Sequence, residues 1–519
     1  MVEKQTQTVV ATDKSGTVRW RYIILALVLG TIAFLIMPGE SLNSTGEVIS
    51  GLSYPGRAVV AIAIFMATLW VCAALPVTVT ALLPLVLFPL CTGGVISVKT
   101  AAAPYAHELI FLFMGGFMMS LAMQQWGLHR RLALHAIRLI GTKPTRLVAG
   151  LMVSCAFISM WVSNTATAVM MMPIALSVIE LVRAELSKTG SASVPPPGKP
   201  FNFAICLMLG IAYAASIGGI GTLIGTPPNA LMAAFLMDNY ETEISFAKWA
   251  IMTCPLVAVF LPIVWLLLTK VIFPIRIQSI PGGQAFIHKE LQNQGPLSRG
   301  EFMVLIVFVV TAVAWMTRPL LVQLTLPGGL RPLAGLSDPG IAMSAALVLF
   351  CLPVDLKRGV FALTWEQARK LPWGILILFG GGLSLATAFK TSGVTEFIGR
   401  SVSEFDHLPT WAMVLLACSI SALVSELTSN TASTAILLPI FAAVAEGFGI
   451  NPLLMIVPAT IGASFAFMMP VATPPNALVF ASGEISISHM CKAGVWLNIV
   501  GIILVMLHMY FIVSPVLMP

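Results

Sequence analysis

Two short polar strings each occur twice in this chain, and their residue types suit the binding of a small cation and a carboxylate. Ser163–Ala166 reads Ser-Asn-Thr-Ala and recurs as Ser429–Ala432, while Thr226–Leu231 reads Thr-Pro-Pro-Asn-Ala-Leu and recurs as Thr473–Leu478. Hydroxyl oxygens, amide oxygens and backbone carbonyls that proline frees from a helix are hard ligands suited to a dehydrated Na⁺. The helix N-termini that such strings begin favour anions.

The surroundings of these strings are those of an integral membrane protein. The chain is 58% hydrophobic and 9% charged, against about 25% charged residues in soluble domains. Its 519 residues leave room for roughly ten or more spans of about 20 residues each. The net charge of +7 is explained by cytoplasmic loops, which collect Lys and Arg, so no nucleic-acid partner is implied.

Charge sets the orientation of the first half. A polar leader, residues 1–21, precedes the first span, so the N-terminus is expected in the cytoplasm. The first four spans are expected at about 22–37, 57–74, 76–92 and 108–128. They lead to residues 129–146, which carry basic side chains and no acidic one, as a cytoplasmic segment does: Arg130, Arg131, Arg138, Lys143 and Arg146. Arg130 and Arg131 are expected to reach the membrane interface.

Residues 147–183 are an almost uninterrupted apolar sequence with the Ser-Asn-Thr string at its centre. One span needs about 20 residues and two need about 40 plus a turn, so this segment fits neither. Basic residues flank it, Arg146 before and Arg183 at its end, which indicates that it enters from the cytoplasm and returns there. We therefore predict a re-entrant helical hairpin whose tip is buried in protein or lines a wet cavity.

The second half repeats this plan at a constant offset of 266 residues, as from Ser163 to Ser429. Residues 157–175 aligned on residues 423–441 share seven identities in 19 positions, which are Ser159/Ser425, Ser163/Ser429, Asn164/Asn430, Thr165/Thr431, Ala166/Ala432, Pro173/Pro439 and Ile174/Ile440. The Pro-Pro-Asn strings lie 247 apart, from Thr226 to Thr473, because the first repeat has a longer connection at about 187–200. Duplicated polar breaks of this kind are typical of transporters built from two repeats.

The two repeats are predicted to be inverted. Residues 395–412, which correspond to the basic segment 129–146, carry Glu396, Glu404 and Asp406 against the single Arg400, so the second hairpin, at about 410–446, opens outward. The five spans between the hairpins are expected at about 203–238, 249–273, 302–323, 339–354 and 372–390, and those after them at about 452–484 and 493–514. The fold class is therefore an all-α polytopic membrane protein with about 11 transmembrane helices plus two re-entrant hairpins in two inverted-topology repeats, in the cell (inner) membrane with its C-terminus outside.

Each string also has a purely structural interpretation. Ser-Asn-Thr could only cap a helix, and Thr-Pro-Pro-Asn could only end one, but two copies of both in matching positions favour a site. Each tip facing the broken span of its own repeat would provide one cation position, and no Arg or Lys adjoins either string. An anion would then depend on the helix dipoles and on the cations, which is a physical reason for coupling. Glu426 is equally compatible with a functional intramembrane carboxylate and with a hydrogen-bonded structural acid.

The paired Ser-Asn-Thr motifs, the Thr-Pro-Pro-Asn breaks and the predicted plan resemble the divalent anion/sodium symporter family, which includes Na⁺-coupled di- and tricarboxylate transporters. The resemblance covers about residues 22–514. It implies a transporter and not an enzyme, an elevator-type homodimer in the lipid bilayer, a small dicarboxylate substrate, at least two Na⁺ and no organic cofactor. The implied segments are a cytoplasmic leader at 1–21, scaffold helices at 22–106, the repeat 1 core at 107–240, scaffold helices and connecting loops at 241–370, the repeat 2 core at 371–485 and a last span at 486–519.

The same resemblance implies the site residues. The first Na⁺ site would use Ser159, Ser163, Asn164 and the backbone of Gly225, and the second would use Ser425, Ser429, Asn430 and the backbone of Ala472. The substrate carboxylates would meet Asn164, Thr165, Asn430 and Thr431, with Thr226 and Thr473 close by. Family members often carry Thr at the position of Ser425, a change that keeps the hydroxyl. Thr at the third motif position in both repeats favours four-carbon dicarboxylates.

The leading hypothesis is import of C4-dicarboxylates (succinate, malate, fumarate) coupled to Na⁺ by an elevator-type alternating-access mechanism. The alternative of the same fold is a Na⁺-independent dicarboxylate/dicarboxylate or citrate/dicarboxylate exchanger. A carboxylate-binding membrane receptor is a third hypothesis, against which the absence of a sizeable soluble domain argues. A Na⁺/H⁺ antiporter is a fourth, because of Glu426.

Overall fold

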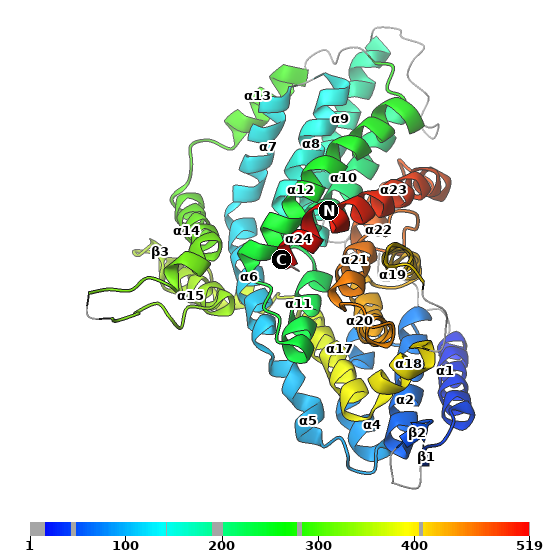
Figure 1. Cartoon of the computed structure of the whole chain (residues 1–519). Helices are drawn as coiled ribbons and strands as arrows, with labels where there is room; N and C mark the ends of the chain where they lie inside the picture. Colours follow the sequence, from blue (N-terminus) through cyan, green and yellow to red (C-terminus); the bar gives the residue numbers. More distant parts are fainter. Residues whose placement is uncertain are drawn as a thin grey trace. The chain divides into compact units, whose positions relative to one another are not determined.

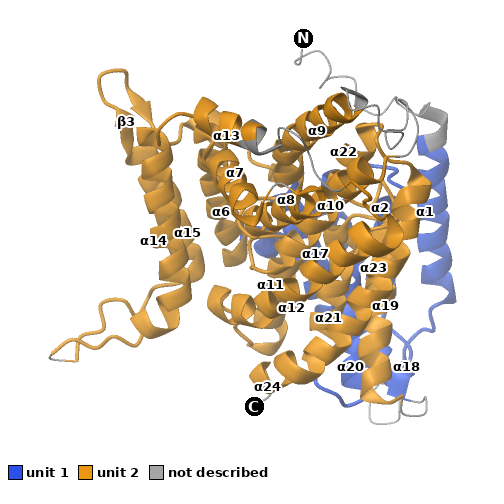
Figure 2. Cartoon of the chain, turned by 90° about the horizontal axis from the view of Figure 1, so that it is seen from above, with its two compact units in different colours: residues 1–106, 374–407, 435–452 blue, residues 107–373, 408–434, 453–519 orange. Residues whose placement is uncertain are grey.

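The structure is a computed structural model that describes residues 16–42, 48–141, 143–188, 201–277, 283–327, 329–403 and 408–517. Its helices form two compact units. Unit 1 holds residues 1–106, 374–407 and 435–452, and unit 2 holds residues 107–373, 408–434 and 453–519 (Figure 2). Lys4, Lys14, Glu404, Asp406 and most of the connection at 187–200 lie outside the described residues. The predicted boundaries between scaffold and core segments stay a prediction.

Unit 1 contains the first helices of the chain and two short paired strands. Its elements are α1 (Gly16–Ile36), β1 (Ser41–Leu42), β2 (Val48–Ser50), α2 (Tyr54–Val71), α3 (Val77–Thr80), α4 (Pro84–Cys91), α5 (Val98–Ala102), the 3₁₀ helix η1 (Ala103–Ala106), nearly all of α17 (Trp373–Thr391), α18 (Val394–Ser403) and the later part of α20 (Asn430–Gly447). The expected span at 76–92 is divided here into α3 and α4, with Pro76 preceding the first and Pro84 opening the second. Proline at a first helical position is favourable because its missing N–H would have had no partner there.

Unit 2 contains both string pairs. Its first elements are α6 (Glu108–Trp126), α7 (Leu128–Ile140), α8 (Pro144–Ser159), α9 (Asn164–Lys188), α10 (Asn202–Ile220), α11 (Pro227–Tyr240), α12 (Phe246–Leu266), the π-helix η2 (Leu267–Ile272), α13 (Gly283–Asn293), α14 (Arg299–Leu321) and α15 (Asp338–Cys351). The remaining ones are β3 (Pro353–Asp355), β4 (Val360–Phe361), α16 (Trp365–Ala368), α19 (Thr410–Leu427), the start of α20, α21 (Leu453–Ala463), α22 (Pro474–Ala481), α23 (Ile487–His508), the π-helix η3 (Met509–Val513) and α24 (Ser514–Leu517).

Ten helices among the described residues are long and apolar enough to cross a membrane. They span Arg19–Ile36, Tyr54–Val71, Val98–Trp126, Asn164–Leu186, Asn202–Ile220, Phe246–Ile272, Arg299–Leu321, Trp373–Thr391, Thr410–Leu427 and Ile487–Leu517. Four shorter apolar helical segments accompany them: Val77–Cys91, Pro144–Ser159, Asp338–Cys351 and Leu453–Ala463. The chain is a helical, multi-pass membrane protein, as its composition predicts.

Each duplicated string stands at a helix boundary. α8 ends at Ser159 and α9 begins at Asn164, and these two helices pack against each other (Figure 1). In the second copy α20 begins at Asn430. The expected broken spans are likewise pairs of helices, α10 with α11 and α21 with α22, and the second member of each pair begins with the two prolines. Re-entry of the helix pairs into the membrane stays a prediction.

Helix α10 lies at the centre of unit 2. All of its residues except the first are buried, and it packs against α8, α9, α12 and α22. A helix that is apolar all round is one enclosed by protein, so α10 is surrounded by both arms of the first helix pair and by an element of the second repeat.

The basic segment 129–146 contains a helix that hydropathy did not predict. Gly127, with a φ of 75°, ends α6 and allows the sharp turn into α7. α7 is amphipathic: Leu128, Ala133, Leu134 and Ile137 are buried, whereas Arg130 and Arg138 are exposed.

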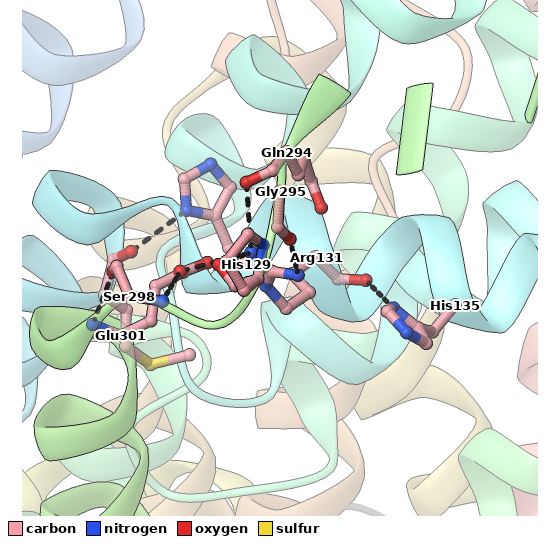
Figure 3. Close-up of polar contacts among 9 residues, drawn as sticks. His129, Arg131, His135, Gln294, Gly295, Ser298 and Glu301 are labelled. Carbon is pink, nitrogen blue, oxygen red and sulfur yellow. Dashed lines mark hydrogen bonds and ion pairs between the residues drawn. The ribbon is translucent and has the colours of Figure 1, made fainter. Parts of the chain in front are cut away.

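Arg131 on α7 fastens this helix to α14 rather than reaching out alone. Its guanidinium pairs with Glu301, with Nε 2.8 Å from Oε1, and donates to the carbonyl oxygens of Gly295 and Pro296 at 3.1 and 3.2 Å (Figure 3). Glu301 also forms the capping box of α14 with Ser298. This ion pair joins three segments of unit 2, and the position of Arg130 and Arg131 at the membrane interface stays a prediction.

Candidate cation and carboxylate site

The tip of the first helix pair brings two of the predicted cation ligands together. The fully buried Ser159 ends α8, and its hydroxyl donates a hydrogen bond of 2.6 Å to Oδ1 of Asn164, the first residue of α9. Ser163 Oγ accepts from the backbone N–H of Ala166 at 3.3 Å, a helix-capping contact. The capping interpretation of the string is therefore correct for Ser163, and the oxygens of Ser159 and Asn164 lie side by side.

The first tip contacts the break of its own repeat. A Cβ atom added to Gly219 would lie 2.5 Å from Asn164 Oδ1, and one added to Gly225 would collide with the backbone of Gly219. The hydroxyl of Thr222 donates to the carbonyl of Met160. Asn164, Gly219 and the predicted backbone ligand at Gly225 are therefore gathered in one place, where only glycine leaves enough room.

The tip of the second helix pair has the same residues in a different arrangement. Ser425 is fully buried. Within the described part of the chain, neither its Oγ nor Oδ1 of Asn430 has a hydrogen-bond partner. A buried acceptor left without a partner costs about 1–3 kcal/mol. Two such oxygens fit a cation, since coordination would remove that cost.

The second break is held by Glu426. Its carboxylate accepts from the backbone N–H groups of Phe467 at 2.8 Å, Met468 at 2.9 Å and Met469 at 3.1 Å, and from Nδ2 of Asn498 at 2.9 Å. Hydrogen bonds to a charged acceptor are the strong ones. This carboxylate therefore fixes the irregular backbone that follows α21, and the structure gives it a hydrogen-bonded role.

The predicted substrate-binding threonines occupy helix starts. Thr165 and Thr431 are the second residues of α9 and α20, and Thr226 and Thr473 precede the prolines of α11 and α22. Thr473 Oγ1 accepts from the N–H of Asn476 at 3.3 Å. Helix N-termini carry a partial positive charge, so this placement suits a carboxylate. Among the described residues, no hydrogen bond joins the Ser429–Thr431 tip directly to Ala472 or Thr473.

Three residues that hold the breaks in place were not predicted from the sequence. The amides of Asn229 and Asn476 donate to backbone carbonyls of their own breaks. Tyr213, fully buried in α10, donates to the carbonyl of Phe467 at 2.9 Å, which ties the first repeat to the second break. The recurrence of Asn at the fourth place of both Thr-Pro-Pro-Asn strings was the available signal, whereas nothing in the sequence distinguishes Tyr213.

A second link between the repeats joins α9 to the segment that follows α22. Arg183 on α9 forms a two-pronged ion pair with Glu484, at 2.8 and 2.7 Å. Such bidentate pairs fix geometry as well as adding energy. α22 also packs against both α9 and α10, so the first helix pair and the second break form one packed body within unit 2.

Comparison with known proteins places this arrangement among transporters. Residues 18–518 match the family described as the sodium:sulfate symporter transmembrane region. A sodium-dependent dicarboxylate transporter, SdcS, of Staphylococcus saprophyticus is 39% identical over 467 residues, which cover 90% of this chain and 88% of that protein. The SdcS protein of Staphylococcus aureus is 37% identical over 501 residues, 95% of this chain and 92% of that protein.

Two solved structures share the fold. The YdaH transporter of Alcanivorax borkumensis aligns with a TM-score of 0.54 at 16% identity, covering 96% of this chain and 98% of that one. MtrF of Neisseria gonorrhoeae, described as illuminating a class of antimetabolite efflux pumps, aligns with a TM-score of 0.56 at 14% identity, covering 98% and 97%. At such identities the likeness concerns the fold alone.

Proposed function

Because the chain belongs to the sodium:sulfate symporter family of membrane transporters, we propose that it imports C4-dicarboxylates such as succinate, malate and fumarate together with Na⁺. The family is one of transporters and not of enzymes. The observation that carries the proposal is the pair of buried oxygens of Ser425 and Asn430, which have no hydrogen-bond partner among the described residues and lie in the motif that recurs at the first tip. The dicarboxylate is taken from the SdcS relatives, which are 37–39% identical.

Two cation positions are proposed, one in each repeat. The first is formed by Ser159, Ser163, Asn164 and the carbonyl of Gly225, and the second by Ser425, Ser429, Asn430 and the carbonyl of Ala472. Support for the first comes from the contacts that gather Ser159, Asn164 and the Gly219–Gly225 break. All are neutral oxygen donors, which suit a hard monovalent cation.

The substrate carboxylates are proposed to bind at the helix starts that carry Asn164, Thr165, Asn430 and Thr431, with Thr226 and Thr473 nearby. These positions offer hydroxyl, amide and backbone N–H donors but no full positive charge. Cations bound next to them would supply the missing charge, so substrate affinity would rise when Na⁺ is bound. That electrostatic dependence is the proposed basis of coupling.

The remaining proposals concern the whole assembly. Alternating access by an elevator-type movement, a homodimer, an N-terminus in the cytoplasm and a C-terminus outside are consistent with the family and with the basic residues of α7. The two inverted repeats, each with one tip and one break, would place a single anion position between two cation positions.

Transport in proteoliposomes tests this function. Uptake of radiolabelled succinate should require an inward Na⁺ gradient and should fall to background when choline replaces Na⁺. Exchange of external for internal succinate that is equally fast without Na⁺ would contradict symport and would favour the exchanger. Failure of succinate to move under any ionic condition would contradict the dicarboxylate substrate itself.

A further inference from the structure

The asparagines of the two Thr-Pro-Pro-Asn strings make the same contact in both repeats. Nδ2 of Asn229 donates to the carbonyl oxygens of Gly219 at 3.1 Å and Thr222 at 2.7 Å. Nδ2 of Asn476 donates to those of Ala466 at 2.8 Å and Met469 at 3.0 Å. In each repeat the acceptors lie 10 and 7 residues before the asparagine. The contact is therefore a shared structural feature of the two repeats.

The orientation of both amides follows from their surroundings. Carbonyl oxygens only accept hydrogen bonds, so the NH₂ group of each amide has to face them. The side chain of Asn229 thus reaches back from the first turn of α11 to the end of α10 and the turn after it. The side chain of Asn476 reaches back from the first turn of α22 to the irregular backbone that follows α21. Both Asn229 and Asn476 have 0% of their surface exposed, so neither amide has water as an alternative partner.

These hydrogen bonds close a loop around each proposed backbone ligand. In each break the amide satisfies two backbone carbonyls: that of Gly219 belongs to the end of α10, and the other three follow α10 or α21. The carbonyl bonded at Thr222 and the amide at Asn229 lie on either side of Gly225. In the same way Met469 and Asn476 lie on either side of Ala472. The backbone that would present its carbonyl to a cation is therefore anchored at both ends by one side chain.

We propose that Asn229 and Asn476 are positioning residues for Na⁺: each holds the break so that the carbonyl of Gly225 or of Ala472 stands at cation-binding distance. The inference rests on the proposed function, because it takes those two carbonyls as ligands. Neither asparagine needs to touch the cation. Supporting residues of this kind tune metal affinity and ion preference through the ligands they orient.

The experiment uses the full-length protein, purified in detergent without substrate. The midpoint of thermal unfolding is followed while NaCl or LiCl replaces choline chloride, which yields an apparent affinity for each ion. Asn229→Leu and Asn476→Leu remove the donors at nearly constant volume. Asn239→Leu is the matched control, because Asn239 also lies on α11 but donates to the carbonyl of Phe235 within its own helix.

Each break variant is expected to raise the half-saturating Na⁺ concentration about tenfold and to reduce the preference for Na⁺ over Li⁺, while Asn239→Leu leaves both as in the wild type. A role limited to ending the helix would lower the unfolding midpoint in choline and leave both ion affinities unchanged. That second result would overturn the proposal. If a Leu variant does not fold, Asn229→Ala and Asn476→Ala, which also remove the amide donors, replace it with the same expectation.

The outcomes separate this inference from the proposed function. A wild-type protein that shows no response to Na⁺ would contradict the proposed Na⁺ coupling. A wild-type protein that responds to Na⁺, with break variants that respond identically, would contradict only the role of the asparagines.

Discussion

In each repeat a hydrogen bond joins the tip to the break at an equivalent position, but the bonded groups differ in charge. In the first repeat the carbonyl of Met160 accepts a hydrogen bond from the hydroxyl of Thr222. The corresponding residues of the second repeat are Glu426 and Met469, and there the carboxylate of Glu426 accepts from the backbone N–H of Met469 at 3.1 Å. The contact is neutral in one repeat and charged in the other.

The tips differ in the same sense. Oδ1 of Asn164 already accepts the hydroxyl of Ser159 at 2.6 Å, whereas Ser425 Oγ and Asn430 Oδ1 have no partner among the described residues. A cation in the first repeat would first require the Ser159 proton to turn away. In the second repeat it would meet two oxygens that have no hydrogen-bond partner among the described residues. Glu426 follows Ser425 directly in the chain, and a negative charge nearby favours a cation. We therefore expect the second position to bind Na⁺ more tightly.

The largest effect is expected from Asn430→Ala. It removes a proposed cation ligand and a proposed donor to the substrate, and hydrogen bonds to charged groups are worth about 1.5–3 kcal/mol each. Succinate uptake at limiting Na⁺ should fall roughly 100-fold. The comparison predicts a smaller loss for Asn164→Ala, measured in the same proteoliposomes at equal protein density. Uptake by Asn430→Ala with wild-type Na⁺ dependence would remove the second tip from the site.

Glu426→Gln is the next change in order of effect. Loss of the charge should weaken Na⁺ binding about tenfold, which corresponds to about 1.4 kcal/mol, while the side chain keeps its size. The matched change in the first repeat, Thr222→Val, removes two neutral hydrogen bonds, to the carbonyl of Met160 and from the N–H of Gly225, and should cost only about threefold. The half-saturating Na⁺ concentration for uptake distinguishes them, and equal shifts in the two variants would refute the charged and neutral distinction.

The serines give a smaller contrast. Ser425→Ala removes an unpartnered oxygen and should raise the half-saturating Na⁺ concentration about fivefold. Ser159→Ala also removes an oxygen but frees Oδ1 of Asn164, so about a twofold increase is expected. A larger effect of Ser159→Ala than of Ser425→Ala would reverse the order of the two cation positions.

Thr431→Val should have the smallest effect on the cation. It removes a hydroxyl expected to meet the substrate carboxylate, so the half-saturating succinate concentration should rise about threefold with little change in Na⁺ dependence. Thr165→Val should behave alike, since both threonines are second residues of their helices. A shift in Na⁺ affinity that exceeds the shift for succinate would show that these hydroxyls are cation ligands instead.

The sequence predicted those features that repeat. Both Ser-Asn-Thr strings and both Thr-Pro-Pro-Asn strings stand at helix boundaries because proline and capping side chains act locally. Helix α7 was missed, since its three arginines and two histidines lower its hydropathy and its stability depends on burying one face against α8 and α14. Helices α3 and α4 were predicted as one span for a different reason: hydropathy stays high across the turn between them.

The hydrogen bonds that hold the two breaks could not be predicted from the local sequence. The partners of Glu426 are backbone N–H groups 41 to 43 residues away, and which residue faces them depends on how α19 packs against α21. The amides of Asn229 and Asn476 act across only a few residues, yet the prolines beside them gave a sufficient reason for the break. The overlooked signal was that asparagine follows the two prolines in both copies, although the prolines alone are enough to interrupt the helix.

The coupling ratio of transport tests the central claim, two cation positions around one anion position, most directly. In proteoliposomes with fixed Na⁺ and succinate gradients, the membrane voltage at which net succinate flux vanishes gives the number of Na⁺ carried per substrate. We predict at least two Na⁺ per succinate, and one fewer effective Na⁺ when Ser425 and Asn430 are both replaced by Ala, if flux persists. A wild-type reversal voltage that corresponds to one Na⁺, or that does not respond to Na⁺, would contradict it.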